Sequence, residues 1–98
     1  MIVNLTPHEV NIGSLTIPSS GVARLAAKIV SAGNFEGVPL TRTEFGKPEG
    51  LPEAEEGTLL IVSQLIKSAL PERTDLVVPA ELVRDDKGVI IGCRSLGI

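Results

Sequence analysis

The sequence has few residues on which catalysis, metal binding or a disulfide could rest. Among its 98 residues Cys93 is the only cysteine and His8 the only histidine. A single cysteine excludes an internal disulfide, so we expect a fold that needs no oxidising compartment. One His and one Cys without a paired motif do not make a closed zinc site, and no phosphate-binding loop or dinucleotide fingerprint is present. We therefore expect no metal and no cofactor.

Aromatic residues and long apolar runs are also scarce. Phe35 and Phe45 are the only aromatic residues. No run approaches the roughly 18 to 20 apolar residues of a membrane span, and the chain does not open with a basic segment followed by an apolar one. We expect a cytosolic protein that makes no membrane contact. The net charge of −3 argues against a nucleic-acid polymer as partner, because such binding relies on Lys and Arg. A small anion needs only a local basic cluster.

The chain is rich instead in aliphatic residues and in turn formers. Apolar residues make up 43% of it, and ten Gly and seven Pro imply many turns. Its length allows one domain over residues 1–98. β-Branched side chains suit strands. The composition therefore predicts a small β-rich α+β domain.

The first half of the chain reads as an antiparallel meander. Alternation and turn residues predict strands over 1–5, 9–12 and 15–17, with a hairpin turn at Gly13-Ser14. Residues 22–25 and 27–30 are predicted as strands or one bent strand, although a helix over 23–30 is the alternative. A turn is expected over 33–37, followed by an edge strand over 38–43.

Residues 44–57 differ in composition from the rest of the chain. They hold five Glu, two Pro and three Gly with almost no apolar residue, which predicts a long, solvated acidic loop. Loops of this length in compact domains are often lids or binding loops.

The second half begins with the clearest structural pattern. The apolar run 58–62 predicts a strand buried on both faces. Ser63 is a suitable cap for a helix over 64–70, with Leu65, Ile66 and Ala69 on one face. A strand over 76–78 would complete a parallel β-α-β crossover. A hairpin is expected last, with strands over 81–84 and 89–93 around the turn 85–88.

Candidate nucleophiles stand in poor settings. Ser63, His8 and Asp75 form a triad on paper, but no serine lies in a G-x-S-x-G elbow. For His8 we favour a hydrogen bond to backbone in its Thr-Pro-His corner over ligand contact. Cys93 could pair with His8 as a thiolate, but it follows an apolar strand, where core packing is the better interpretation. We expect a protein that is not an enzyme.

The arginines carry the strongest indication of binding. Arg42, Arg73 and Arg84 lie beside acids or hydroxyls, so they either form local salt bridges that fix turns or line a cleft for an anionic molecule. Phe45, or else Phe35, could stack on a base there. The predicted ligand-binding residues are His8, Arg42, Thr43, Phe45, Arg73, Asp75 and Arg84.

Several segments together resemble a family of small proteins from phages, prophages and bacterial genomes. They are Asn4-Leu5-Thr6-Pro7-His8-Glu9-Val10, residues 37–40, 50–52, 57–58 with 61–63, 75–77, and 83–85 with Gly88 and Gly92-Cys93. The size and phage association of this family are similar to those of anti-defence proteins that sequester cyclic-nucleotide or cyclic ADP-ribose signals, the so-called sponges. The resemblance implies a non-catalytic nucleotide-signal binder in the host cytosol, without assigning any binding residue. The alternative is a structural or protein-interaction module for phage assembly or inhibition of a host protein. Exposed strand edges in so small a domain favour a homo-oligomer.

Overall fold

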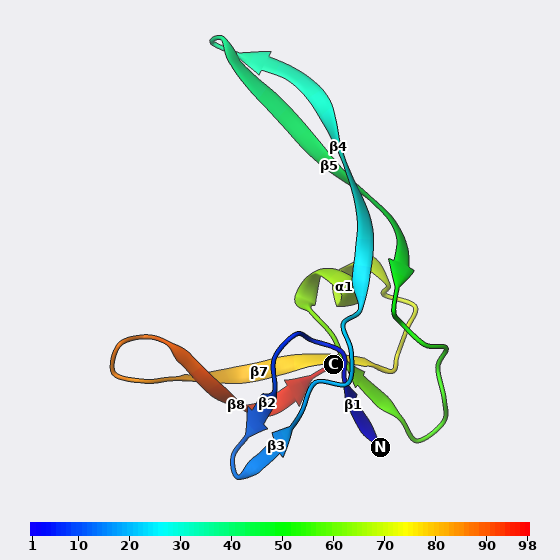
Figure 1. Cartoon of the computed structure of the whole chain (residues 1–98), viewed down its shortest axis with the longest axis vertical. Coiled ribbons are helices and arrows are strands. Elements are labelled where there is room, and N and C mark those ends of the chain that lie inside the picture. The colour runs from blue at the N-terminus through cyan, green and yellow to red at the C-terminus, as the bar shows by residue number, and fades with distance from the viewer.

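The computed structural model describes residues 1–98 and is mostly β, with 55% of residues in strands and 6% in one helix. This confirms the predicted small β-rich α+β fold. Six strands form one sheet in the order β1-β6-β7-β8-β2-β3, and β4 and β5 form a separate two-stranded ribbon (Figure 1). The elements are β1 (Ile2–Asn4), β2 (Val10–Ile12), β3 (Leu15–Ile17), β4 (Arg24–Phe35), β5 (Val38–Glu49), β6 (Leu59–Ile61), α1 (Gln64–Ala69), β7 (Leu76–Arg84) and β8 (Ile90–Gly97).

The strand β6 is the centre of the fold. It pairs in parallel with β1 on one side and with β7 on the other, and α1 connects β6 to β7, which confirms the predicted crossover. The place of β1 corrects the predicted N-terminal meander, because β2 pairs in antiparallel fashion with β3 but not with β1. Ser63 caps the helix, because its side-chain oxygen accepts from the backbone N–H of Ile66 at 3.4 Å. Of the predicted helix face only Ile66 is buried. Leu65 is 49% exposed, because consecutive residues point about 100° apart around a helix and α1 is too short to bury a second row.

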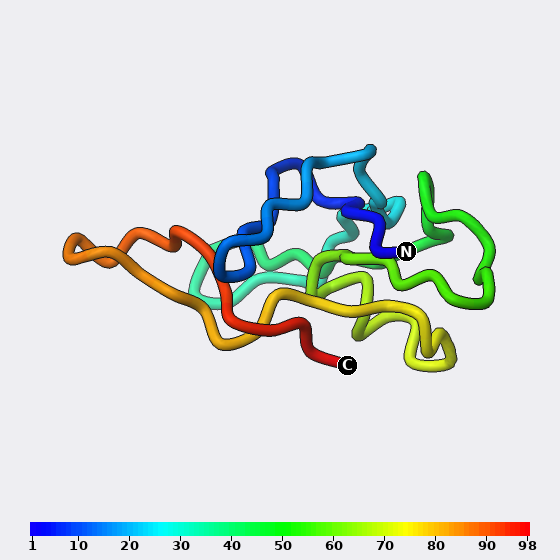
Figure 2. The backbone as a smooth tube through the Cα atoms, turned by 90° about the horizontal axis from the view of Figure 1, so that it is seen from below, coloured from blue at the N-terminus to red at the C-terminus, as the bar shows by residue number.

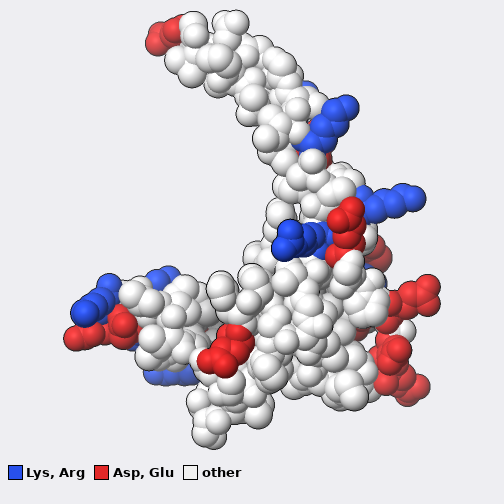
Figure 3. All heavy atoms as spheres, viewed as in Figure 1, with Lys and Arg blue, Asp and Glu red and all other residues white.

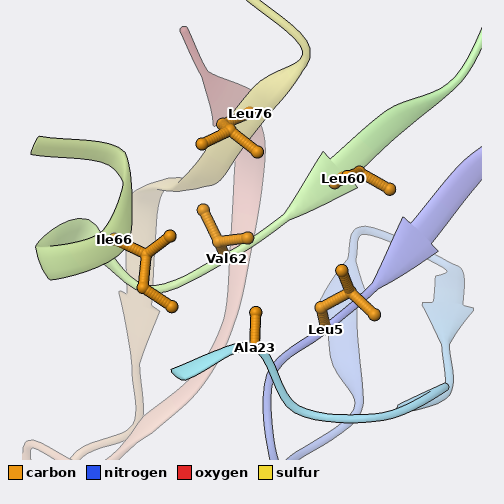
Figure 4. Packing of buried hydrophobic residues seen from close by; sticks show 6 residues of the cluster. All are labelled: Leu5, Ala23, Leu60, Val62, Ile66 and Leu76. Carbon is orange, nitrogen blue, oxygen red and sulfur yellow. The ribbon is translucent and has the colours of Figure 1, made fainter. Parts of the chain in front are cut away.

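Two apolar clusters cover the two faces of this centre. One comprises Leu5, Ala23, Leu60, Val62, Ile66 and Leu76, whose side chains converge between α1, β6, β7 and the N-terminal segment (Figure 4). The other comprises Val10, Ile61, Val77 and Cys93. Leu60 and Ile61 belong to different clusters because successive side chains of a strand point to opposite faces. The predicted two-sided burial of the 58–62 run is confirmed for residues 60–62, whereas Leu59 is 37% exposed.

The buried side chain of Asn4 fixes the N-terminal corner. Its amide nitrogen donates to the carbonyl oxygens of His8 and Ile17 at 2.8 and 3.0 Å. Its oxygen accepts from the backbone N–H and the hydroxyl of Thr6 at 3.0 and 2.6 Å. Asn4 thus uses both donors and both acceptor sites. It holds the Thr-Pro-His corner against the end of β3.

The ribbon of β4 and β5, which we call the arm, projects from the body of the molecule (Figure 1). Each strand has 12 residues, about 40 Å of extended chain. The strand interpretation is therefore confirmed over the helical alternative from Arg24 onward, although residues 22 and 23 lie outside the strand. The turn is shorter than the predicted 33–37, because Phe35 still pairs with Val38 and only Glu36 and Gly37 connect the strands.

The predicted acidic loop over 44–57 is wrong in its first part. Residues 44–49 belong to β5, where Glu44 lies opposite Lys28 and Glu49 opposite Arg24. Their polar composition reflects a ribbon that is solvated on both faces, and opposite charges across the strands favour the pairing. Only the residues between β5 and β6 form the loop.

The prediction of two short strands over 76–78 and 81–84 is also corrected, because β7 is one strand of nine residues. Pro79 is tolerated within it because β7 pairs with β6 only through Leu76 and Val77 and beyond them only with β8. The hairpin of β7 and β8 turns where predicted, with Gly88 at a φ of 82°. It reaches away from the body, as Figure 2 shows in orange.

Removing the Asn4 side chain should destabilise the protein markedly. In Asn4→Ala the Ile17 carbonyl and the Thr6 N–H lose their bonds to this side chain, and the His8 carbonyl keeps only the Thr6 hydroxyl. We expect a loss of about 3 kcal/mol in the free energy of unfolding. Urea denaturation measures it. The matched control is Asn34→Ala, an exposed arm residue whose side chain forms no hydrogen bond, with an expected change under about 0.5 kcal/mol. Equal effects of the two substitutions would contradict this role of Asn4.

Candidate functional site

A cavity of about 320 Å³ lies between β2 and the β7–β8 hairpin, and we call it the β8 cavity. Its size lies at the low end of small-molecule sites. Gly92 allows this arrangement, because a Cβ atom there would lie 2.9 Å from the carbonyl oxygen of Asn11. Polar groups come only from its β2 side, and the rest of the wall is mostly apolar. The lining residues are His8, Glu9, Val10, Asn11, Pro79, Leu82, Ile90, Ile91, Gly92 and Cys93.

His8 stands at this cavity with an exposed side chain. The prediction that His8 hydrogen-bonds backbone in its corner is wrong. Only the His8 carbonyl is bonded there, and it accepts from the side chains of Asn4 and Thr6. The imidazole forms no hydrogen bond within the chain. The ring is therefore free to meet a ligand in the β8 cavity.

Cys93 reaches the same cavity but belongs to the core. Its side chain is 3% exposed and packs with Val10, Ile61 and Val77. The predicted core packing of Cys93 is confirmed. No hydrogen bond connects its thiol to His8.

The three residues of the candidate catalytic triad, Ser63, His8 and Asp75, lie apart in the structure. The Ser63 hydroxyl caps α1, and Asp75 lines a different, smaller cavity with Met1 and Pro52. Only His8 faces the β8 cavity. The chain thus does not bring these three side chains together.

Arg73 and Asp75 form the one salt bridge of the protein. The Arg73 Nε donates to Asp75 Oδ1 and its Nη2 to Oδ2, each at 2.8 Å, and Nη2 also donates to the carbonyl oxygen of Pro52 at 2.9 Å. These bonds lower the pKa of Asp75 below its usual value, although burial opposes the shift. They raise the pKa of Arg73. The pair joins the segment after α1 to the loop before β6, so for Arg73 the salt-bridge interpretation is confirmed.

Arg84 stabilises the turn between β7 and β8. Its Nη1 donates to the carbonyl oxygen of Gly88 at 2.9 Å. Asp85 does not pair with it but accepts from the backbone N–H groups of Lys87 and Val89 at 2.8 and 3.0 Å. The turn is held by backbone hydrogen bonds and not by the expected salt bridge.

Arg42, Thr43 and Phe45 share the strand β5 on the arm and are all exposed. Their side chains form no hydrogen bond or ion pair within the chain. Arg42 lies opposite Val30, and Thr43 opposite Ile29. Because side chains alternate along a strand, Arg42 points to one face of the arm while Thr43 and Phe45 point to the other.

The predicted binding residues thus fall into four separate places in one chain. Arg42, Thr43 and Phe45 lie on the arm, Arg73 and Asp75 in the segment between α1 and β7, Arg84 at the hairpin turn and His8 at the β8 cavity. A single cleft lined by Arg42, Arg73 and Arg84 is not formed within one chain. Asn11, Leu82 and Ile91 line the cavity but were not predicted as site residues from the sequence. The alternating polar and apolar residues of β2 and the apolar run before Gly92 could have indicated an exposed apolar wall.

No group of three or more His, Cys, Asp or Glu side chains is placed to hold a metal ion. The single helix has six residues. It is too short to cross a membrane, and the structure contains no other helix. Comparison with protein families, curated proteins and solved structures returns no match. The case for function therefore depends on the geometry of the chain itself.

The Arg73–Asp75 pair should make stability depend on pH below about 4. Because the folded pKa of Asp75 is lowered, its contribution is complete above the ordinary value of 3.8 and is lost as pH falls through the folded value. At neutral pH we expect Asp75→Asn to lower the free energy of unfolding by about 2 kcal/mol. Urea denaturation from pH 7 to pH 2.5 should show the gap to wild type closing. Asp86→Asn, at an exposed turn acid, is the control, and a gap that stays constant with pH would refute the assignment.

Proposed function

We propose that this protein is a non-catalytic binder that sequesters a small anionic, nucleotide-derived signalling molecule. The observation that carries the proposal is the state of Arg42, an exposed guanidinium without any side-chain partner in the chain. Thr41 and Thr43 flank it, and Phe45 follows on the same strand. Arg73, by contrast, is engaged by Asp75.

The chemistry of this segment suits a phosphorylated nucleoside. A guanidinium presents several donors to a phosphate and the hydroxyls add more, while an aromatic ring offers a stacking surface to a base. Since Arg42 and Phe45 point to opposite faces of the arm, a ligand touching both must wrap around the outer edge of β5. That edge pairs with no other strand, so its backbone N–H groups are also available as donors. We place this activity in the host bacterial cytosol, where the lone thiol of Cys93 stays reduced.

A second candidate function is a structural or protein-interaction module, as in phage assembly or inhibition of a host protein. The observation that favours it is the number of apolar side chains that the arm exposes, including Ile29, Phe35 and Val38. Such side chains in contiguous patches mark interaction surfaces. This candidate predicts that no nucleotide changes the melting temperature.

A thermal-shift screen against cyclic dinucleotides, cyclic trinucleotides and cyclic ADP-ribose isomers tests the first proposal. A ligand at a hundredfold excess over its Kd should stabilise the protein by about 2.7 kcal/mol. Arg42→Ala should weaken binding at least tenfold in calorimetry, because charge-assisted bonds to phosphate are lost. The control is Arg94→Ala, at an exposed arginine of β8 outside the arm. Absence of any stabilising nucleotide, or equal effects of the two substitutions, would refute the proposed site, and a chemically altered ligand after heat release would refute sequestration without turnover.

A further inference from the structure

The chain exposes more surface than a protein of its size that folds alone. Its exposed area of 6978 Å² exceeds by about 1,600 Å² the roughly 5,400 Å² expected of a compact monomer of 10.3 kDa. Its radius of gyration is 16.4 Å, against about 13 Å for a compact chain of this length. Only 12 of the 98 residues are buried. The arm and the β7–β8 hairpin, which leave the body in different directions (Figure 1), account for this shape.

The outer half of the arm is almost free of charge. Residues 29–41 include one charged residue, Glu36, and Figure 3 shows this part of the arm white except for its tip. The strand register sorts the apolar residues by face. Phe35 lies directly opposite Val38, and Leu40 shares the face of Val38 by alternation. Val30, opposite Arg42, completes the set on that side. We call these four residues, Val30, Phe35, Val38 and Leu40, the apolar face of the arm.

A ribbon of this kind is marginally stable in water by itself. Two paired strands need a third strand or a packed face for independent stability, yet residues 31–49 are all exposed. Both outer edges of the ribbon are also unpaired. A stable arm therefore requires another surface that packs against its apolar face.

A matching apolar surface lies at the β8 cavity. Leu82, Ile90 and Ile91 line it and are 48%, 50% and 53% exposed. The arm of the same chain projects away from this hairpin (Figure 1). An arm from another molecule is a suitable occupant, because its apolar face matches the apolar hairpin wall formed by Leu82, Ile90 and Ile91, while the polar His8, Glu9 and Asn11 lie on the β2 side of the cavity.

We propose that the protein forms a homodimer by arm exchange, in which the apolar face of each arm packs on the β8 cavity of the other copy. If each copy buries its excess area, the dimer buries about 3,200 Å², which is in the range of obligate homodimers. The reciprocal contact is the closed, two-fold arrangement that most homo-oligomers adopt. The docking requires no ligand, so its test is separate from the nucleotide screen.

Light scattering during size-exclusion chromatography tests the dimer at micromolar concentration. The full chain should elute at twice the 10.3 kDa of one chain, and the double variant V38E/L40E should elute as a monomer. The matched control P39E/T41E places the same charges on the same strand but on the other face, and it should remain dimeric. Circular dichroism confirms that each variant is folded. A monomeric wild type, or equal behaviour of the two variants, overturns the proposal.

Should V38E/L40E fail to fold, a shortened arm provides a second test. In this variant Asn-Gly replaces residues 31–41. The two residues form a favoured hairpin turn between Val30 and Arg42, which are cross-strand partners in the arm. The deleted residues contribute nothing to either core cluster. This variant should be folded and monomeric, and a dimer would overturn the role of the arm.

Disulfide trapping tests the surface on which the arm docks. With the native Cys93 of the cavity replaced by Ala in all copies, Val38→Cys copies mixed with Ile90→Cys copies should give a covalent dimer on oxidation, since the proposed docking brings these two side chains together only between molecules. In the control mixture Leu15→Cys replaces Ile90→Cys. Leu15 is 54% exposed on β3 and does not line the β8 cavity. A dimer without the Val38–Ile90 crosslink, or with an equal Leu15 crosslink, overturns the assignment of the β8 cavity.

Discussion

The fold depends on β6, a strand of three residues whose neighbours cover both of its faces. Leu60 and Ile61 of β6 and Val62 directly after it are at most 2% exposed, and they divide between the two apolar clusters. The strands β1 and β7 pair with β6 directly, and α1 packs its one buried residue, Ile66, against it. Burying such side chains contributes about 1.5 to 3 kcal/mol each, so this short strand and its neighbours supply most of what stabilises the chain. The outer half of the arm and the tip of the β7–β8 hairpin contribute no residue to either cluster.

Polar contacts then fix the segments that the small core cannot reach. Asn4 holds the N-terminal corner through four hydrogen bonds, and the Arg73–Asp75 pair joins the segment after α1 to the loop before β6. Both sites are satisfied internally, with no buried side-chain nitrogen or oxygen left without a partner. The arginine of this pair is therefore a structural residue. Side chains without an internal partner, such as Arg42 on the arm and His8 at the β8 cavity, remain available to bind a ligand or another protein.

The sequence predicted those elements whose cause is local. The apolar run before Ser63, the cap itself and the glycine of the last hairpin each act through neighbouring residues, and each was confirmed. Residues 44–49 were misread because a ribbon solvated on both faces has the composition of a loop, and its partner strand lies 16 or more residues away. The exposure of Leu65 was likewise not predicted, because it depends on the tertiary contacts of α1, which bury only Ile66. The state of each arginine was open for the same reason, since only the folded chain shows that Arg73 meets Asp75 while Arg42 meets nothing.

The two proposals meet at Arg42. By the register of the arm, Arg42 lies on the same face as Val38 and Leu40, immediately inside the apolar half. In the arm-exchanged dimer it would therefore stand at the rim of the interface, where polar and charged groups remain in contact with water. A rim position keeps a guanidinium accessible to an anion, and the dimer holds the strand that carries it. A rigid ribbon loses less conformational freedom on binding than a mobile one, which favours affinity without any additional contact. The dimer would thus prepare the ligand site of each arm, even though neither arm needs the ligand in order to dock.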